Sequence, residues 1–407
     1  MAEPKKDFYI SRKEYLEQLI SYKDEQLIKV VTGMRRCGKS TLLFDIYFDW
    51  LIKSGVSDEQ IIRVDLESLE FSALYEPEAL YKYVTDRLIQ GKKNYVLIDE
   101  VQNCKEFQRA VDSLYIKKDV DVYITGSNAY LFSGELATLL SGRYVTIEML
   151  PLSFKEYLEG TSGTDAPLEK KYRDYVLFGG LPKVAAYKGD MRKINSYLDG
   201  IYNTIFKKDI VDRNKIVNVP LFEDVMKFVM SNIGSPISTK SISDFLTSNR
   251  KKVYAPMIED FLQCLIDSYM IYKAQRFDIK GKELLKSLAK YYVTDLGLRN
   301  YLLGYQDIDR GHVLENVIYT ELLRRGYRVF TGKTANGEID FVAVKQDETT
   351  YVQVAETVKA QETLERELAP LRAIRDFNPR MLITLDYDLN SSYDGIKHVN
   401  ALEFLMG

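Results

Sequence analysis

The sequence predicts an α/β fold in which helices surround a parallel β-sheet. Short apolar runs alternate with segments of helical periodicity between residues 12 and 150, an order that is typical of parallel sheets. The run at 27–31 leads directly into a loop with two glycines, and the later runs at 94–100 and 120–128 end in polar residues. At 407 residues the chain is long enough for about two to three domains.

Each predicted element of the first part follows from its pattern. Apolar residues at helical spacing predict amphipathic helices, and short continuous apolar runs predict buried strands. In chain order we expect a helix at 12–20, a strand at 27–31, a helix at 41–47, a strand at 61–67, a helix at 81–89, a strand at 94–100, a helix at 102–114, and strands at 120–128 and 145–150.

The loop between the first strand and its helix reads Gly-Met-Arg-Arg-Cys-Gly-Lys-Ser at 33–40. Its glycines allow the backbone to turn successive N–H groups toward an anion, and a helix N-terminus adds its positive dipole end. We expect Lys39 to meet the β- and γ-phosphates and Ser40 to offer its hydroxyl to Mg²⁺. The motif therefore predicts a site for ATP and Mg²⁺ formed by Gly33, Arg35, Arg36, Cys37, Gly38, Lys39, Ser40 and Thr41.

Two carboxylates end the apolar run at 94–100, and the first of them lies 60 positions after Lys39. In a nucleotide site of this kind the first acid, Asp99, holds the Mg²⁺ shell. The second acid, Glu100, orients and deprotonates the attacking water. The spacing therefore predicts a second half of the same site.

Two further residues are candidates for catalysis. Asn128 follows the strand at 120–128 and is placed to sense the γ-phosphate, although Ser127 and Asn128 are also good caps for a following helix. Arg143 precedes the last strand and is a candidate arginine finger from a neighbouring subunit of a homo-oligomer, with a solvated loop arginine as the alternative.

Composition limits the classes of function. A formal net charge of −3 disfavours a chain coated for nonspecific nucleic-acid binding. The three cysteines are far apart in the sequence, which supports neither a disulfide framework nor a zinc cluster. We find no apolar signal core and no run long enough for a membrane span, so we expect a cytoplasmic protein without a membrane partner.

These motifs, together with Ser-Gly-Arg-Tyr at 141–144 and Gly-Gly-Leu-Pro at 179–182, resemble archaeal and bacterial AAA+-like ATPases whose C-terminal half is a domain of unknown function. The resemblance covers most of the chain. It implies a P-loop NTPase sheet of the ASCE class, a winged-helix segment and a nuclease-like end. We expect an ATPase domain at 1–160, a helical lid or linker at 161–218, a winged helix at 219–300 and a degenerate nuclease-like domain at 301–407.

The winged-helix expectation rests on helical patterns at 221–232, 239–246 and 253–267, followed by strands at 269–277 and 290–295. Basic side chains on such a wing can neutralise phosphates without reading bases, while a winged helix that packs on protein is the alternative. The candidate DNA contacts are Arg250, Lys251 and Lys252, with Lys280, Lys282, Lys286 and Lys290 near the wing.

The last part of the chain resembles the core of the PD-(D/E)XK nucleases. A helix at 312–323 carries Glu315, and a strand at 337–344 carries Glu338 and Asp340. In that core such acids hold Mg²⁺ at the scissile phosphate. The next strand departs from the pattern, because Gln353 replaces a carboxylate and Ala355 replaces the lysine; carboxylates are the better Mg²⁺ ligands.

We therefore expect this domain to be an inactive nuclease, with Lys345, Glu356 and Lys359 as possible substitutes for the missing groups. The sequence as a whole favours an ATP-hydrolysing switch that is coupled to nucleic-acid or protein-partner binding. The alternatives are an ATP-gated, metal-dependent DNA nuclease and a signalling scaffold that assembles with nucleotide and never touches DNA.

Overall fold

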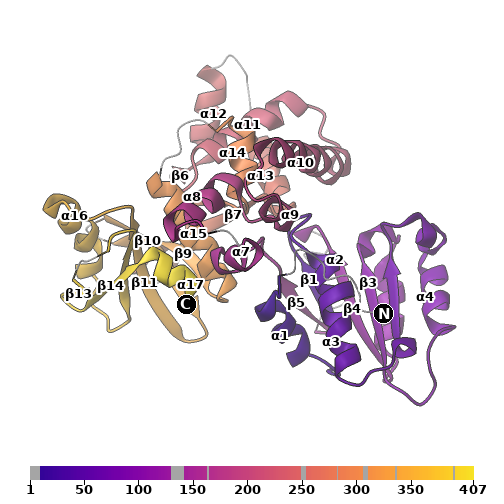
Figure 1. The fold of residues 1–407 in the computed structure, drawn as a ribbon. Coiled ribbons are helices and arrows are strands. Elements are labelled where there is room, and N and C mark those ends of the chain that lie inside the picture. The colour runs from indigo at the N-terminus through magenta and orange to yellow at the C-terminus, as the bar shows by residue number, and fades with distance from the viewer. Residues whose placement is uncertain are drawn as a thin grey trace. The chain divides into compact units, whose positions relative to one another are not determined.

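The computed structural model describes residues 10–129, 142–162, 165–248, 254–281, 283–305, 310–334, 337–387 and 390–407. The chain divides into two compact units. Unit 1 comprises Met1–Pro151 with Asp267–Tyr269, and unit 2 comprises Leu152–Ile266 with Met270–Gly407. Figure 1 shows the elements of both units.

Unit 1 is built on a parallel sheet of five strands in the order β2-β3-β4-β1-β5. Strand β4 lies between β1, which precedes the phosphate loop, and β3, which ends in the acidic pair. Because the strands are parallel, their carboxyl ends all lie at the same edge of the sheet. The strands are β1 (Ile28–Thr32), β2 (Ile61–Asp65), β3 (Asn94–Asp99), β4 (Val120–Gly126) and β5 (Tyr144–Glu148).

Helices cover both faces of this sheet, because alternate residues of each strand point to opposite sides. On one face Val96 and Ile98 pack with α4 and α5. On the other face Tyr95 and Leu97 pack with α1 and the helix after the phosphate loop. The helices are α1 (Lys13–Ser21), α2 (Lys39–Thr41), the π-helical η1 (Leu42–Tyr47), α3 (Phe48–Lys53), α4 (Pro77–Thr85) and α5 (Phe107–Tyr115).

Helix α4 begins and ends four residues earlier than the helix expected at 81–89. Pro77 occupies its first turn, where the missing N–H of proline costs nothing. Three short 3-10 turns, η2 (Asp58–Gln60), η3 (Leu69–Leu74) and η4 (Val101–Asn103), complete the unit.

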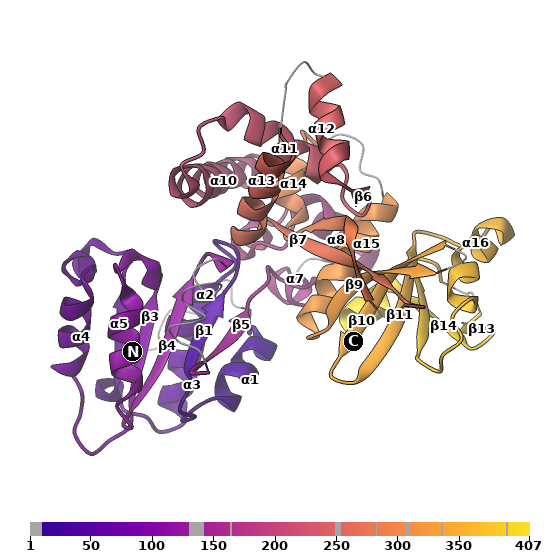
Figure 2. The ribbon, with the colours of Figure 1, turned by 180° about the vertical axis from the view of Figure 1, so that it is seen from behind.

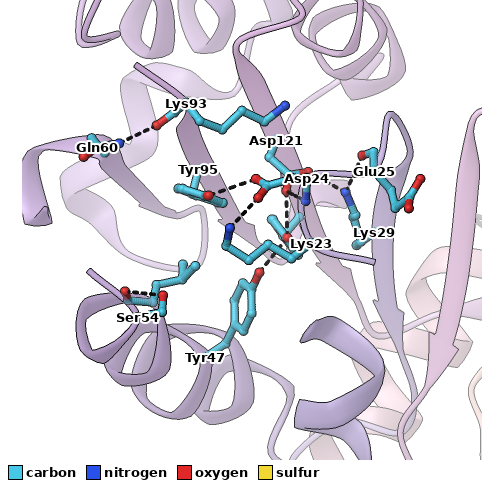
Figure 3. A network of polar contacts seen from close by, with 12 residues as sticks. Lys23, Asp24, Glu25, Lys29, Tyr47, Ser54, Gln60, Lys93, Tyr95 and Asp121 are labelled. Atoms are coloured by element: carbon cyan, nitrogen blue, oxygen red, sulfur yellow. Dashed lines mark hydrogen bonds and ion pairs between the residues drawn. The ribbon is translucent and has the colours of Figure 1, made fainter. Parts of the chain in front are cut away.

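A buried polar network lies at the amino-terminal edge of the same sheet (Figure 3). Lys29 on β1 forms an ion pair with Asp121 on β4, and both side chains are fully buried. The Tyr47 hydroxyl donates to Tyr123 at 2.6 Å, and Tyr123 donates to Asp121 at 2.8 Å. The backbone N–H of Asp24 adds a further bond to Asp121 at 2.9 Å. This network fixes the register of β1 against β4.

The first half of unit 2 is helical. Asp295 connects two of its segments, because its buried carboxylate accepts hydrogen bonds from the N–H groups of Gly180 and Leu298, both at 2.8 Å. The helices are α7 (Phe154–Gly160), α8 (Leu168–Phe178), α9 (Pro182–Ala186), α10 (Met191–Thr204), the π-helical η6 (Ile205–Asp212), α11 (Val219–Ser231), α12 (Thr239–Ser248), α13 (Ala255–Asp267) and α14 (Leu296–Leu302).

The second half of unit 2 is organised around a mixed sheet of nine strands in the order β13-β14-β12-β11-β10-β9-β7-β8-β6, much of which can be followed in Figure 2. Its strands are β6 (Pro236–Ile237), β7 (Ile271–Asp278), β8 (Glu283–Val293), β9 (Arg328–Thr334), β10 (Gly337–Lys345), β11 (Glu348–Ala355), β12 (Arg380–Thr384), β13 (Ser392–Tyr393) and β14 (Ile396–Asn400). Three helices accompany them: α15 (Arg310–Arg324), α16 (Gln361–Arg372) and α17 (Ala401–Met406).

The hairpin of β7 and β8, expected as the wing of a winged helix, belongs to this large sheet. Strand β7 pairs in parallel with β9, so that Arg276 lies opposite Thr331. Residue 300, the expected boundary between the two C-terminal domains, therefore lies within one compact unit.

Candidate functional site

The phosphate loop connects β1 to α2, and its two glycines have positive φ angles. Gly33 has a φ of 137° and Gly38 has a φ of 107°. A Cβ atom on Gly33 would lie 2.1 Å from the carbonyl oxygen of Met149. Only glycine fits at position 33, because both the conformation and the space exclude a side chain.

The side chain of Lys39 forms hydrogen bonds with the backbone of the phosphate loop. Its ammonium donates to the carbonyl oxygens of Gly33 at 2.9 Å and Met34 at 3.1 Å, and the side chain is buried. These bonds keep the charge inside the loop, where a phosphate group would compete for it. The other predicted loop residues differ in their surroundings. Arg36 is exposed and has a φ of 68°, whereas Cys37 is buried in the core. Arg35 forms an ion pair with Glu67 at 2.9 Å.

Asp99 ends β3 at the same edge of the sheet and lies beside the loop. The hydroxyl groups of Ser40 and Thr125 both form hydrogen bonds with its carboxylate. Burial raises the pKa of Asp99 above its ordinary value, and the two hydroxyl groups offset part of that increase. A bound cation would stabilise the charged carboxylate further. The predicted Mg²⁺ ligands Ser40 and Asp99 are therefore together, and their oxygen atoms suit that ion.

Glu100 follows in a left-handed backbone conformation, with a φ of 48°, and is almost fully buried. Thr125 accepts a hydrogen bond from its backbone N–H at 3.0 Å. One carboxylate oxygen accepts bonds from the amide of Gln102 and from the hydroxyl of Ser127, the latter at 3.1 Å. The proposed base is thus held by two donors in this conformation.

Thr125, Gln102 and Ser127 were not assigned these contacts from the sequence. In the sequence, each of the three lies within two residues of a predicted site residue or of a strand end. Closeness in the sequence alone does not determine the direction of a side chain. Asn128, the proposed sensor, is buried two residues after β4, at the edge where Gly126 pairs with Thr32 beside the phosphate loop. The alternative prediction, a cap for a following helix, concerns residues 130–141, which lie outside the described part of the chain.

Arg143 lies away from the nucleotide site of its own chain, and its predicted role as an arginine finger concerns a neighbouring subunit. It precedes β5 at the amino-terminal edge of the sheet, where Tyr144 lies opposite Ile28. The five residues of β1 separate that edge from the phosphate loop by about 16 Å. Arg143 instead forms an ion pair with Asp112.

The comparisons with known proteins identify the domains and the family of the chain. Residues 25–158 match the model of an AAA domain, and residues 169–309 match a domain of unknown function, DUF8612. An uncharacterized protein of Haemophilus influenzae is 38% identical over 400 residues, which is 98% of each chain. The chain belongs to the family of that protein. A second member, an uncharacterized protein of Methanocaldococcus jannaschii, is 30% identical over 370 residues, which is 86% of this chain and 79% of that one.

The comparison with solved structures concerns the fold of this chain. The Walker-type ATPase paby2304 of Pyrococcus abyssi matches with a TM-score of 0.52 and 16% sequence identity, covering 72% of this chain and 96% of that one. The predicted P-loop ATPase fold with its parallel sheet is confirmed. Among the described residues, no helix combines the length and the apolar character needed to cross a membrane.

The acidic residues predicted for a nuclease-like centre also lie together, in unit 2. Glu315 comes from α15, Glu338 and Asp340 from β10, and Gln353 from β11, where its amide oxygen accepts from the N–H of Asp340 at 3.3 Å. Gln353 also donates to Glu367 at 2.8 Å. Within the described ranges, no group of three or more His, Cys, Asp and Glu residues is arranged to hold a metal ion.

Lys290 lies in the middle of these acids. It is on β8 of the hairpin expected as the wing, but its side chain is buried and is not available to neutralise phosphates as expected. It is 5% exposed, and its ammonium contacts Glu315 and Glu338 at 2.9 Å and Asp340 at 3.2 Å. Burial alone would lower the pKa of Lys290, but the surrounding carboxylates outweigh that effect and raise it. Burial raises the pKa of Glu315 and of Asp340, as expected where three carboxyl groups share one ammonium.

The three possible substitutes for the missing nuclease groups make their contacts elsewhere. Lys345 donates to the carbonyl oxygen of Arg325 at 2.7 Å, Glu356 pairs with Arg310 at 3.4 Å, and Lys359 pairs with Asp386 at 3.9 Å. The candidate DNA contacts Arg250, Lys251 and Lys252 lie outside the described residues.

Proposed function

We propose that unit 1 binds and hydrolyses ATP with Mg²⁺ and that the nucleotide state switches the binding of a nucleic acid or a protein partner. The observation that carries the proposal is the convergence of Lys39, Ser40, Asp99 and Glu100 at one edge of the sheet, with Thr125 bonded to both acids. Sheet, loop and acids are the parts that phosphoryl transfer to water requires.

The proposal gives each residue a role. The backbone N–H groups of residues 33–41 and the ammonium of Lys39 would hold the phosphates, while Ser40 and Asp99 would hold Mg²⁺. The bound ion supplies neutralising charge on the phosphate oxygens. Because Cys37 is buried in the core, position 37 contributes its backbone to the loop.

Glu100 is the proposed base. A general base must reach the proton of the attacking water, while structures without substrate commonly show such groups in other hydrogen bonds. Here Gln102 and Ser127 occupy one of its oxygens. We infer that nucleotide binding, with Asn128 contacting the γ-phosphate, exchanges these bonds for a bond to water. Arg143 remains a proposal only as a group acting on a neighbouring subunit.

The partner of the switch is proposed to bind unit 2. Residues 219–300 include the helices α11, α12 and α13 and the hairpin of β7 and β8, which keep the order expected for a winged helix. Arg250, Lys251 and Lys252 precede α13 and are the proposed phosphate contacts. The nuclease alternative is disfavoured by Lys290, whose ammonium lies among the acids that would hold the metal ion.

The coupling is tested by measuring ATP turnover and the mass in solution of the full chain, with and without duplex DNA. Stimulation of turnover by DNA, with binding that weakens as salt rises, supports a nucleic-acid partner. The variant Lys251→Glu/Lys252→Glu should lose that stimulation and keep its basal turnover. If DNA has no effect and ATP changes the mass, the switch acts on protein assembly instead.

A further inference from the structure

Lys290 is the one buried lysine of unit 2 among the described residues that is enclosed by three carboxylates. We propose that Lys290 supplies the resident cation of this acidic centre, so that its ammonium takes the place of a divalent metal ion and the centre binds none. The inference concerns unit 2 and does not depend on the proposed ATPase activity.

The geometry is that of an ammonium site. An ammonium group has three N–H donors, and the Nζ atom of Lys290 has three carboxylate partners at 2.9, 2.9 and 3.2 Å. The contacts with Glu315 and Asp340 are charge-assisted hydrogen bonds of normal length, and the contact with Glu338 is an ion pair. Mg²⁺ and Ca²⁺ bind oxygen at about 2.0 to 2.6 Å. The acids therefore surround Lys290 at ammonium distances and would have to move inward to bind a metal ion in its place.

The partners come from different parts of the chain. Lys290 is on β8, Glu315 is on α15, and Glu338 and Asp340 are on β10. The ammonium therefore joins the hairpin to the helix and the strand that carry the nuclease-like acids. A buried charge that lacked this pairing would be costly, so the contacts favour a fixed lysine over one that moves aside.

Two of the acids around Lys290 accept further hydrogen bonds from the protein. The oxygen of Glu315 that contacts Lys290 accepts a bond from the hydroxyl of Tyr292 at 2.6 Å. The second oxygen of Asp340 accepts from the backbone N–H of Val354 at 3.0 Å. A hydroxyl and a backbone N–H thus add to the ammonium in stabilising Glu315 and Asp340.

The excess of acid predicts what happens when the ammonium is removed. With three carboxylates around one lysine, Lys290→Met leaves a cavity lined by acids with no positive partner of comparable burial. Arg276 lies 3.8 Å from Glu338 and contacts no other acid of the centre within salt-bridge distance among the described residues. A hard divalent cation is the natural occupant of such a cavity.

The test measures Mn²⁺ binding to the nucleotide-free full chain by electron paramagnetic resonance. All proteins carry Asp99→Asn, which removes the proposed metal ligand of unit 1. The parent and Lys290→Arg should show no specific Mn²⁺ site. Lys290→Met should gain one site, whose affinity for Mn²⁺ is at least tenfold higher than that of any residual binding to the parent. Adding Asp340→Asn to Lys290→Met should abolish it.

Two outcomes would overturn the proposal. One is a Mn²⁺ site in the parent protein that is lost on adding Asp340→Asn. The metal ion and the ammonium of Lys290 would then both occupy the position among the three acids, together or in exchange. The other is a folded Lys290→Met variant that binds no ion, because the ammonium would then not be what excludes the metal.

A second measurement needs no variant of Lys290. Acetic anhydride labelling read by mass spectrometry should modify the exposed Lys280 and leave Lys290 unmodified, and millimolar Mn²⁺ should change neither result. An increase in Lys290 labelling with Mn²⁺ would show that the ion displaces the lysine, and would contradict the proposal even if Lys290→Met failed to fold.

Discussion

At the scale of the residue, Gly33 shows how closely the phosphate loop is fitted to its surroundings. We predict that Gly33→Ala weakens ATP binding and destabilises the protein by about 2 to 4 kcal/mol, because it adds a steric clash to an unfavourable backbone conformation. The clash is with the carbonyl oxygen of Met149, 2.1 Å from the added Cβ atom. Thermal unfolding and nucleotide titration measure the two effects.

Gly55 is the matched control for this substitution. It also has a positive φ, 95°, but a Cβ atom there would have no heavy atom within 4 Å. Gly55→Ala therefore imposes backbone strain without a clash, and should cost about 1 kcal/mol and leave ATP binding intact. Equal losses in the two variants would show that contact with Met149 is unimportant.

The hydrogen bonds to Glu100 lead to a second prediction at this scale. We expect Gln102→Ala to raise basal ATP turnover severalfold, because it removes one of the two hydrogen bonds that hold an oxygen of the proposed base, while the bond from Ser127 remains. Steady-state turnover without DNA or other partner measures the effect. A fall to the level of Glu100→Gln would mean that Gln102 positions the base and does not restrain it.

At the scale of the element, the ion pair of Lys29 and Asp121 holds β1 against β4 (Figure 3). We predict that Asp121→Ala destabilises the protein by about 3 to 5 kcal/mol, because it leaves a buried lysine unpaired. Adding Lys29→Met should restore much of the loss. Denaturant unfolding of the three variants measures the coupling, and additive losses would contradict it.

Asp295 gives a prediction about pH. Burial raises the pKa of Asp295 to about 6, although four backbone N–H groups oppose that shift. The native state thus binds more protons than the unfolded chain between about pH 4 and pH 6, so this group lowers stability as pH rises through that range. In Asp295→Asn the melting temperature should fall less between pH 4 and pH 6 than in the wild type. An unchanged pH dependence would exclude the effect.

The elements differ in how far the sequence predicts them. The loop at 33–40 and the acids at the end of β3 are local patterns with a known geometry, so their positions could be predicted. Lys29 and Asp121, or Glu100 and Ser127, meet only because β4 lies between β1 and β3. Contacts of that kind depend on strand order, which no short motif specifies.

At the scale of the whole molecule, unit 1 has the predicted P-loop ATPase sheet, whereas unit 2 contains a connection that the sequence did not predict. The pairing of β7 with β9 joins residues 276 and 331 across two helices and places Lys290 among the acids of α15 and β10. Lys290 lies in a stretch whose composition is typical of a basic wing. Neither composition nor spacing could assign it to a buried acidic centre, because its partners Glu315 and Asp340 lie 25 and 50 positions away.

Hydrolysis of ATP by unit 1, with Glu100 as the base, is the main proposal for this chain. Its most direct test is the rate of ATP turnover, with the affinity for ATP, in the wild type, in Glu100→Gln and in the control Glu59→Gln, an exposed acid of the same unit. We expect Glu100→Gln to keep its affinity and lose at least about a hundredfold in rate, while Glu59→Gln matches the wild type. Turnover by Glu100→Gln at the wild-type rate would contradict the account.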